Sequence, residues 1–273
     1  MINPIAGKGW NVGWELERFL PKAVAFYREV EELTGGEFYT EMWIERRIET
    51  AKDLRKVQGK LSELEPWINL QRSSDEALFI RGGRLWTTRF LDLTREFFID
   101  QGYFHTRTRS DEAETVVLCE GFEGLQRVGI KHRSAKGQII TVRSQSPLQD
   151  ILVSQGVWVV PEGEGQFRVG ATYEWDVLDQ VPSEAGKDHL LTKACLVLGE
   201  VTLVKHEAGV RPILRQSQPV IGELECGDWI FNGLGSKGGI YAPRTAAYLV
   251  DHLLKGHALP EDLNYHFWRN ENL

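Results

Sequence analysis

The sequence predicts a mixed α/β fold in which helix and strand segments interleave with a largely antiparallel sheet. Three observations predict it. In the first hundred residues, segments whose apolar residues have helical spacing alternate with segments typical of short strands. A run of strands joined by tight turns covers 139–173, and a strand, a glycine turn and a helix follow residue 228. We therefore expect two interleaved lobes rather than two domains in succession.

The composition describes an ordinary globular chain that can bury a core. Of its 273 residues, 42% are hydrophobic and 26% are charged. The net charge of −7 argues against broad binding to nucleic acid or to anionic membranes. The first residues lack a basic segment followed by an apolar one, and no apolar run is long enough to span a membrane. We expect a cytoplasmic protein without membrane association.

The cysteines and histidines predict neither disulfides nor a metal site. The three cysteines, Cys119, Cys195 and Cys226, are odd in number and widely spaced. Two of them, Cys119 and Cys195, lie in apolar runs, where we expect them to pack as small hydrophobic side chains. The seven histidines have no ligand spacing, and no Ser-His-Asp order is suggested, so neither a metal site nor a hydrolase is indicated.

The first hundred residues are expected to alternate between helices and strands. After a dozen residues rich in turn formers, a helix with Pro21 in its first turn ends at Gly35-Gly36. A strand over 38–48 precedes a helix that Thr50 caps, which continues along one apolar side to Leu64. A short strand, a turn and another helix complete this part. The strand is predicted at 77–80, the turn at Gly82-Gly83 and the helix cap at Thr87 or Thr88. The helix is expected to turn four side chains inward, Phe90, Leu91, Phe97 and Phe98.

The middle of the chain is expected to hold one buried strand and then the antiparallel sheet. The run 115–119, TVVLC, is apolar and β-branched, as in a strand that is buried on both faces. Strands are predicted at 139–142, 157–160 and 167–173, with a hairpin connection between the last two. Ser183 caps a helix that reaches Leu198, and a further strand covers 201–206.

The last part of the chain predicts a site for an anion. Strands at 219–221 and 229–232 lead into the turn 233–239, which has four glycines in seven residues and whose backbone can therefore approach a ligand closely. The helix that follows should have Pro243 in its first turn. Its predicted apolar face is Ala246, Val250, Leu253 and Leu254. Free N–H groups and the positive end of the helix dipole would face the anion.

This part of the chain resembles a known family in four ordered motifs. They are Gly209-x-Arg211-Pro212, Pro219-x-Ile221-Gly222, Asn232-Gly233 and Gly238-x-Ile240-x-Ala242-Pro243. Together they are similar to the C-terminal signature of FAD-dependent oxidoreductases of the D-amino-acid oxidase and glycine oxidase family. The resemblance implies a final helix whose N-terminus points at the pyrimidine edge of the flavin, where reduced flavin carries negative charge.

The resemblance also implies how the chain divides. Residues 1–36, 85–135 and 208–273 would form an incomplete, Rossmann-like FAD-binding lobe, and residues 37–84 and 136–207 the substrate-binding lobe with its antiparallel sheet. Family members begin with a strand, a glycine-rich turn, a helix and a second strand that hold the ADP half of FAD. This sequence lacks that N-terminal unit. Either the true start lies upstream or the dinucleotide grip has been lost, and tight FAD binding is doubtful without it. The run TVVLC would then border a gap that exposes apolar surface and unpaired backbone groups.

Arg211 is the catalytic candidate that the resemblance implies, because its planar guanidinium can bind a substrate carboxylate through two hydrogen bonds. The alternative is a buried arginine that ties strands together. The implied flavin contacts are Gly121, Gly233, Gly235, Ser236, Lys237, Gly238, Gly239 and Ile240. Lys237 could instead be an exposed turn lysine. Trp158 stands where glycine oxidase relatives often have a tyrosine; it either lines the substrate pocket or belongs to the core, and this departure weakens glycine as the substrate.

The resemblance implies an oxidoreductase that passes a hydride from an amine or amino acid to FAD, with no general base required. Two alternatives stay open. The chain could be a non-catalytic, cofactor-free remnant of the family, or a flavin domain that acts on modified tRNA. The negative net charge disfavours the second. We expect a small-molecule substrate and no nucleic-acid partner, and the sequence does not indicate the oligomeric state.

Overall fold

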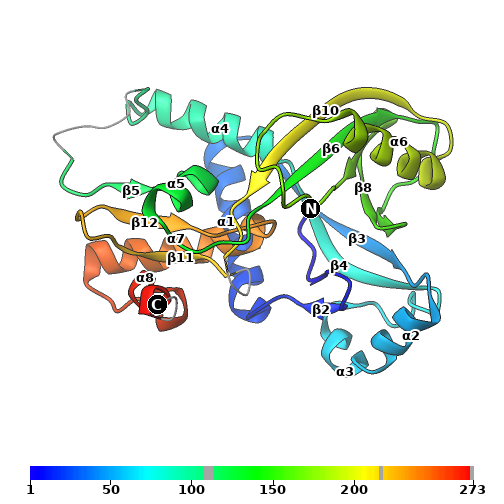
Figure 1. The fold of residues 1–273 in the computed structure, drawn as a ribbon, viewed down its shortest axis with the longest axis horizontal. Coiled ribbons are helices and arrows are strands. Elements are labelled where there is room, and N and C mark those ends of the chain that lie inside the picture. Colours follow the sequence, from blue (N-terminus) through cyan, green and yellow to red (C-terminus); the bar gives the residue numbers. More distant parts are fainter. Residues whose placement is uncertain (107–112, 215–217, 271–273) are drawn as a thin grey trace. The chain divides into compact units, whose positions relative to one another are not determined.

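The computed structural model describes residues 1–106, 113–214 and 218–270, and it divides into two compact units (Figure 1). Unit 1 comprises Met1–Leu16, Thr40–Arg84 and Ala135–Val210. Unit 2 comprises Glu17–Tyr39, Leu85–Ser134 and Arg211–Leu273. The chain passes between the units several times, and each combines helices with strands, so the predicted mixed α/β class is confirmed. Among the described residues, no helix combines the length and the apolar composition needed to cross a membrane.

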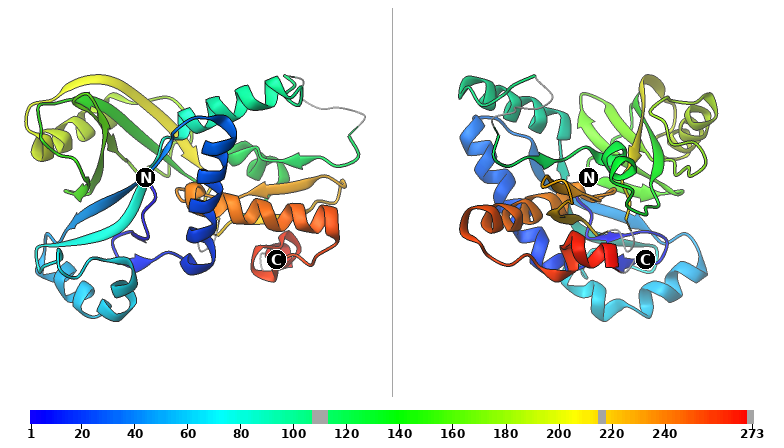
Figure 2. Two further views of the ribbon diagram at one scale, coloured as in Figure 1. Left: turned by 180° about the vertical axis from the view of Figure 1, so that it is seen from behind. Right: turned by 60° about the vertical axis from the view of Figure 1, so that its left-hand side comes forward.

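Unit 1 is built on a seven-stranded sheet with the order β10-β6-β9-β8-β7-β3-β4 (Figures 1 and 2). In chain order, its strands are β3 (Tyr39–Arg47), β4 (Ala77–Leu85), β6 (Ala135–Arg143), β7 (Ile151–Ser154), β8 (Val157–Gly163), β9 (Gln166–Gly170) and β10 (Thr202–Arg211). Strands β7, β8, β9 and β6 pair antiparallel in that order, while β3 and β7 pair parallel. The largely antiparallel sheet expected from the sequence is therefore present, including the hairpin between β8 and β9.

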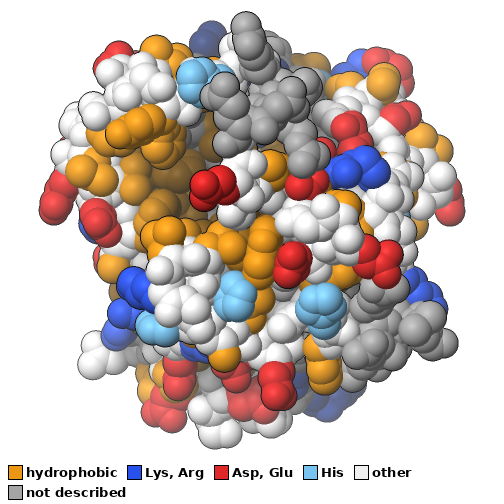
Figure 3. All heavy atoms as spheres, turned by 90° about the vertical axis from the view of Figure 1, so that its left-hand side faces the viewer, with side chains coloured by type: hydrophobic (Ala, Val, Ile, Leu, Met, Phe, Trp, Pro, Cys, Tyr) orange, Lys and Arg blue, Asp and Glu red, His pale blue; other side chains and the backbone are white. Residues whose placement is uncertain are grey.

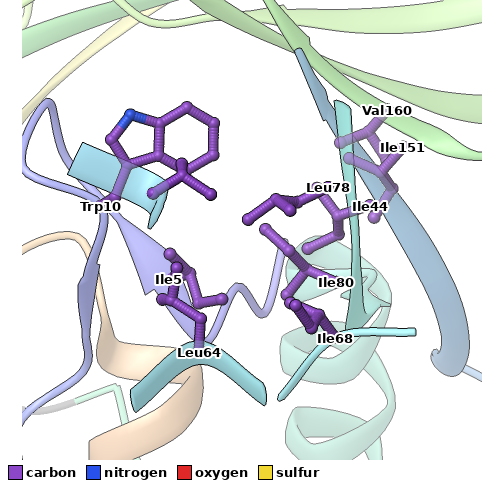
Figure 4. Close-up of a cluster of buried hydrophobic side chains, with 10 residues drawn as sticks. Ile5, Trp10, Ile44, Leu64, Ile68, Leu78, Ile80, Ile151 and Val160 are labelled. Carbon is purple, nitrogen blue, oxygen red and sulfur yellow. The ribbon is translucent and has the colours of Figure 1, made fainter. Parts of the chain in front are cut away.

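Each face of this sheet has its own hydrophobic cluster. On one face Ile140, Val159 and Val169 pack with Leu190 and Ala194 of helix α6 (Glu184–Leu198). The other face carries Ile44, Ile151 and Val160, which pack with side chains of the N-terminal hairpin and the short helices (Figure 4). These elements are β1 (Ile5–Ala6), β2 (Asn11–Val12), α2 (Ala51–Gln58), α3 (Leu61–Leu64) and the 3₁₀ turn η1 (Glu65–Trp67). The alternation of side chains along the strands supplies both clusters.

Two helix starts in unit 1 follow the predicted capping residues. The Thr50 hydroxyl accepts a hydrogen bond from the Asp53 N–H at 3.1 Å, and the Ser183 hydroxyl accepts one from the Gly186 N–H at 3.2 Å. The helix that begins after Thr50 does not reach Leu64 in one piece, because α2 ends at Gln58 and α3 begins at Leu61.

The turn predicted at Gly82-Gly83 is wrong, because both residues lie inside β4. A Cβ built on Gly82 would lie 2.3 Å from Ile44 Cδ1 and 2.7 Å from the Ile2 carbonyl oxygen. The glycine therefore allows Ile2 and β3 to approach the strand closely, and Gly83 forms an antiparallel bridge with Ile2.

Unit 2 contains a three-stranded sheet with the order β11-β12-β5, surrounded by helices. Its elements are α1 (Leu16–Thr34), α4 (Thr87–Asp100), β5 (Val117–Leu118), α5 (Gly121–Val128), β11 (Val220–Glu223), β12 (Trp229–Asn232), α7 (Gly238–Lys255), η3 (Glu261–Leu263) and α8 (Tyr265–Asn270). β12 pairs antiparallel with β11 and parallel with β5. Its hydrophobic cluster includes Leu125, Val220 and Ile230.

The prediction that residues 115–119 form a strand buried on both faces is wrong. Only Val117–Leu118 form β5, and the Val117 side chain is 37% exposed. Among the described residues, the strand lies at the edge of its sheet. Figure 3 shows hydrophobic side chains around a hollow on the side where α4 and β5 lie in Figure 1. Cys119 and Cys195 are exposed, so their expected burial is also wrong.

In two helices of unit 2, the buried face differs from the face that the spacing of apolar residues predicts. In α4, Leu91 and Phe98 are 50% and 47% exposed, and the helix starts after Trp86 without a threonine cap. In α7, Val250 and Leu254 are exposed. The buried residues of α7 are Ile240, Tyr241, Pro243, Thr245 and Leu249.

Two prolines lie further inside their helices than predicted. Pro21 lies five residues after the start of α1 at Leu16, and Pro243 lies five residues after the start of α7 at Gly238. The earlier start of α1 buries Leu16 and Phe19. These two residues extend the apolar stripe that the sequence places further along the helix.

Candidate functional site

The glycine turn of unit 2 is fixed to its surroundings by one asparagine at the end of β12. The Asn232 Oδ1 accepts a hydrogen bond from the Gly233 N–H at 2.8 Å, and its Nδ2 donates to the Gly121 carbonyl oxygen at 2.7 Å. Asn232 is 3% exposed, so both bonds are shielded from water. Gly121, the first residue of α5, is thereby held beside the start of the turn.

The segment after Arg211 is tied to the same turn. The Gly235 N–H donates to the Pro212 carbonyl oxygen at 3.0 Å, and Ile213 forms an antiparallel bridge with Leu234. Arg211 is the last residue of β10 and its side chain is half-buried. The structure therefore brings the Arg211-Pro212 segment, Gly121 and the turn together within unit 2.

The turn glycines have different surroundings. Gly233 has φ +78°, and a Cβ there would lie 2.5 Å from Leu214 Cδ1, so a glycine is needed for packing. Gly235 has φ +54°, but its Cβ position meets only Ile213 Cγ1 at 3.4 Å and one carbonyl oxygen beyond that. At Gly238 the nearest atom is 3.7 Å away, and at Gly121 nothing lies within 4 Å. The open sides belong to Gly121, Gly235 and Gly238.

The N-terminus of α7 follows directly from this open side. No described side chain caps it, since its N-cap residue is Lys237 and makes no side-chain cap hydrogen bond. The N–H groups of Ile240 and Tyr241 donate to the Lys237 carbonyl oxygen, whereas those of Ser236, Gly238 and Gly239 have no hydrogen-bond acceptor among the described residues. Such a helix start favours a negatively charged partner. Flat groups can also approach it, because the turn has little side-chain bulk.

Two side chains fix the first turn of α7 from behind. The Tyr27 hydroxyl donates a hydrogen bond to the Gly239 carbonyl oxygen at 3.1 Å, and burial raises the Tyr27 pKa, so this hydroxyl stays protonated. Ile240 is 2% exposed and anchors the helix in the core of unit 2. Ser236, in contrast, is exposed.

Lys237 is half-buried, so the expectation of an exposed turn lysine is wrong. Burial lowers the Lys237 pKa, and the ammonium nitrogen lies 5.9 Å from the centre of the Tyr241 ring. The Lys237 side chain therefore lies against the first turn of α7.

Trp158 belongs to unit 1 and not to the unit that holds the glycine turn. Its indole ring lies against Gly170, where a Cβ would come within 2.6 Å of the ring atom Cζ2. Trp158 is half-buried and packs at the margin of the cluster drawn in Figure 4. Within unit 1, Trp158 therefore contacts Gly170 and the margin of this hydrophobic cluster.

Sequence reasoning missed two residues of this site, Asn232 and Tyr27. Asn232 belongs to one of the four motifs, and an asparagine between a strand and a positive-φ glycine is a turn signal that could have identified it. Nothing in the sequence pattern indicates that Tyr27 meets Gly239, because the two are far apart along the chain and the contact depends on tertiary packing.

The chain is similar in sequence to known proteins. Residues 41–252 match the family described as FAD dependent oxidoreductase. The bifunctional protein ThiO/ThiG of Trichormus variabilis is 25% identical over 173 residues, which is 60% of this chain and 26% of that protein. The glycine oxidase of Bacillus licheniformis is 27% identical over 191 residues, 64% of this chain and 52% of that protein. The chain thus matches about half or less of the length of these relatives.

Solved structures share the fold. The iminodiacetate oxidase of Chelativorans sp. BNC1 superposes with a TM-score of 0.73 at 19% identity, covering 94% of this chain and 85% of that one. The glycine oxidase of Geobacillus kaustophilus superposes with a TM-score of 0.69 at 20% identity, covering 85% and 76%. The similarity to solved structures therefore extends over most of both units.

Proposed function

Since the chain belongs to the family of FAD dependent oxidoreductases, we propose that it oxidises a small amine or amino acid with FAD as the hydride acceptor. The expected resemblance to the D-amino-acid oxidase and glycine oxidase family is thereby confirmed. The observation that carries the proposal is the uncapped start of α7, joined to the segment after Arg211 by the Gly235–Pro212 hydrogen bond.

The residues around the turn fit the flavin end of FAD. The open sides of Gly121, Gly235 and Gly238 leave room for a flat ring next to the backbone. The N–H groups of Ser236, Gly238 and Gly239 and the Lys237 ammonium group would stabilise negative charge on the ring edge. Gly233 and Ile240 would position this surface through their own packing, and Gly239 would be held by Tyr27.

Arg211 would anchor the substrate. A guanidinium that binds a carboxylate through two hydrogen bonds fixes both the distance and the orientation of the neighbouring amine carbon. Bound FAD would supply the chemistry of hydride acceptance, so the protein needs only to hold the substrate and exclude water. The role of Trp158 stays a prediction of the family resemblance: its half-buried indole would offer apolar surface and one N–H donor to a ligand.

The first experiment measures whether the protein binds flavin. The purified chain is titrated with FAD at equilibrium, and the change in flavin absorbance between about 350 and 500 nm measures bound cofactor even when binding is weak. We expect a protein-bound flavin spectrum. The matched variant is Gly235→Val, whose side chain would fill the open side of the turn at a positive φ, and we expect it to lose the spectrum. A wild-type protein that leaves the flavin absorbance unchanged would contradict the proposal.

The second experiment tests the substrate anchor by turnover of a panel of small and N-substituted amino acids. Loss of a buried charged hydrogen-bond pair costs enough binding energy to lower kcat/KM about 10²–10³-fold in Arg211→Ala. The flavin spectrum should be retained. Arg143→Ala, which removes an exposed arginine at the end of β6, is the control and should leave turnover unchanged. An unchanged KM in Arg211→Ala would remove this residue from the site.

A further inference from the structure

The two edges of the seven-stranded sheet in unit 1 differ. At the β4 edge, Ile2 and Ile68 form antiparallel bridges with Gly83 and Ile80 and so cover the strand. At the other edge lies β10, a strand of 10 residues that runs along the outer rim of the sheet in Figures 1 and 2. Among the described residues, no strand pairs with its outer side. A long open edge presents unpaired N–H and C=O groups that another strand can bind.

Two of the exposed residues in the first half of β10 are apolar. Leu203 and Val204 are 38% and 49% exposed and point to opposite faces of the sheet. The strand has neither a proline nor an interruption that would block pairing. An added strand could therefore gain backbone hydrogen bonds and side-chain contacts on both faces.

Two side chains of opposite charge lie at equal distances from the middle of β10. Lys205 and Glu207 lie on either side of His206, which is close to the middle of the strand. Both charged side chains are accessible, since Lys205 is 63% and Glu207 is 39% exposed. The Glu207 carboxylate is held on one face of the sheet by Lys205 at 2.8 Å and Arg168 at 3.4 Å.

We propose that β10 pairs antiparallel with β10 of a second copy of this chain, about a twofold axis that passes through His206. In this register each Lys205 lies opposite Glu207 of the other copy, and the pairing extends over nearly the whole strand. Two seven-stranded sheets then join into one continuous sheet. The interface is the same surface patch on both copies, as a twofold axis requires.

The charges select this register over its neighbours. In a twofold antiparallel pair one residue faces its own copy, and a shift of the axis by one residue puts Lys205 opposite Lys205 or Glu207 opposite Glu207. Like charges directly opposite each other destabilise a sheet, whereas opposite charges stabilise it. Among the central registers, only the one with its axis at His206 places Lys205 of each copy opposite Glu207 of the other.

The first test is sedimentation velocity on the full chain over a range of concentrations. We expect the wild type to dimerise, Lys205→Glu and Glu207→Lys each to weaken dimerisation about tenfold or more, and the double variant K205E/E207K to restore it. Lys22→Glu, a charge reversal at an exposed position in unit 2, is the control and should dimerise like the wild type. A wild type that stays monomeric, or a dimer that ignores both single variants, overturns the proposal.

The second test reads the register by disulfide formation in a background without the three native cysteines. His206→Cys should cross-link two copies, because the axis places this position opposite itself. Val204→Cys should cross-link with Ala208→Cys when the two proteins are mixed, and neither should cross-link alone. Circular dichroism confirms that each variant is folded. Efficient cross-linking of Val204→Cys with itself would assign another register and would contradict the one proposed.

Discussion

The sheet of unit 1 is covered on both faces by hydrophobic clusters, whereas the sheet of unit 2 ends in a strand of two residues whose Val117 is 37% exposed. The helices show the same contrast. Four residues of α6 are buried against the larger sheet, while none of the 14 residues of α4 is buried. The larger sheet therefore lies between two layers of buried apolar side chains. Unit 2 leaves apolar surface open, and a ligand that binds it would add stability by mass action.

The largest expected effect comes from replacing one apolar side chain in each unit. Ile44 is fully buried in the cluster of unit 1, and Ile44→Ala should lower the free energy of unfolding by about 2–5 kcal/mol through lost burial and a cavity. Leu91 of α4 is 50% exposed, and Leu91→Ala should cost less than about 1 kcal/mol. Urea unfolding followed by circular dichroism measures both. Equal losses would show that the two units do not differ as described.

A second test compares two helical glycines. Gly186 in α6 has its Cβ position 2.3–2.5 Å from the side-chain amide of Gln138, so Gly186→Ala should destabilise the protein by about 1–3 kcal/mol through overpacking. Gly238 in α7 has its nearest neighbour at 3.7 Å, and alanine there should be neutral or stabilise by up to about 1 kcal/mol. Thermal unfolding measures the difference. If both variants behaved alike, close packing at α6 would not be the cause.

The smallest expected effect is a pH dependence in unit 1. The pKa of His206 is lowered, first by burial and then by nearby Lys187 and Lys136, which outweigh Glu184. Since its folded pKa lies below the ordinary value of 6.5, the neutral form stabilises the fold. This stability is complete above about pH 6.5 and is lost as the pH falls through the folded pKa. Unfolding of wild type and His206→Gln between pH 5 and 8 should show a shallower slope for the variant. If the free energy of unfolding had the same pH dependence in both proteins, His206 would be excluded as the group that causes it.

Local signals in the sequence were sufficient for much of the fold. Thr50 and Ser183 predict helix starts because the capping hydrogen bond joins their hydroxyl groups to the backbone N–H three residues later. The hairpin between β8 and β9 likewise follows from Pro161 to Gly165 and the strands that flank them. The Arg211-Pro212 segment and the glycine turn were also found in sequence, and both lie in unit 2 next to each other.

The remaining features depend on contacts that no local pattern contains. Gly82 reads as a turn residue, yet it lies in a strand because Ile44 and Ile2 approach it. The pattern around Val117 is typical of a buried strand, yet among the described residues β5 has a neighbouring strand on one side only. In α7, periodicity predicts an apolar face but not which neighbours cover it, and Val250 and Leu254 of that face are exposed.

The amide of Gln138 links three separate parts of unit 1. Its nitrogen donates to Glu174 at 2.7 Å and to the Ser183 hydroxyl at 2.8 Å, and its oxygen accepts from the Ser183 N–H at 2.8 Å and contacts His206 Nε2 at 2.9 Å. Gly186 of α6 packs against the same amide, so opening the first turn of α6 would break the hydrogen bonds between Gln138 and Ser183. In hydrogen–deuterium exchange, the amides of this corner should therefore be protected together and become labelled in a single cooperative opening.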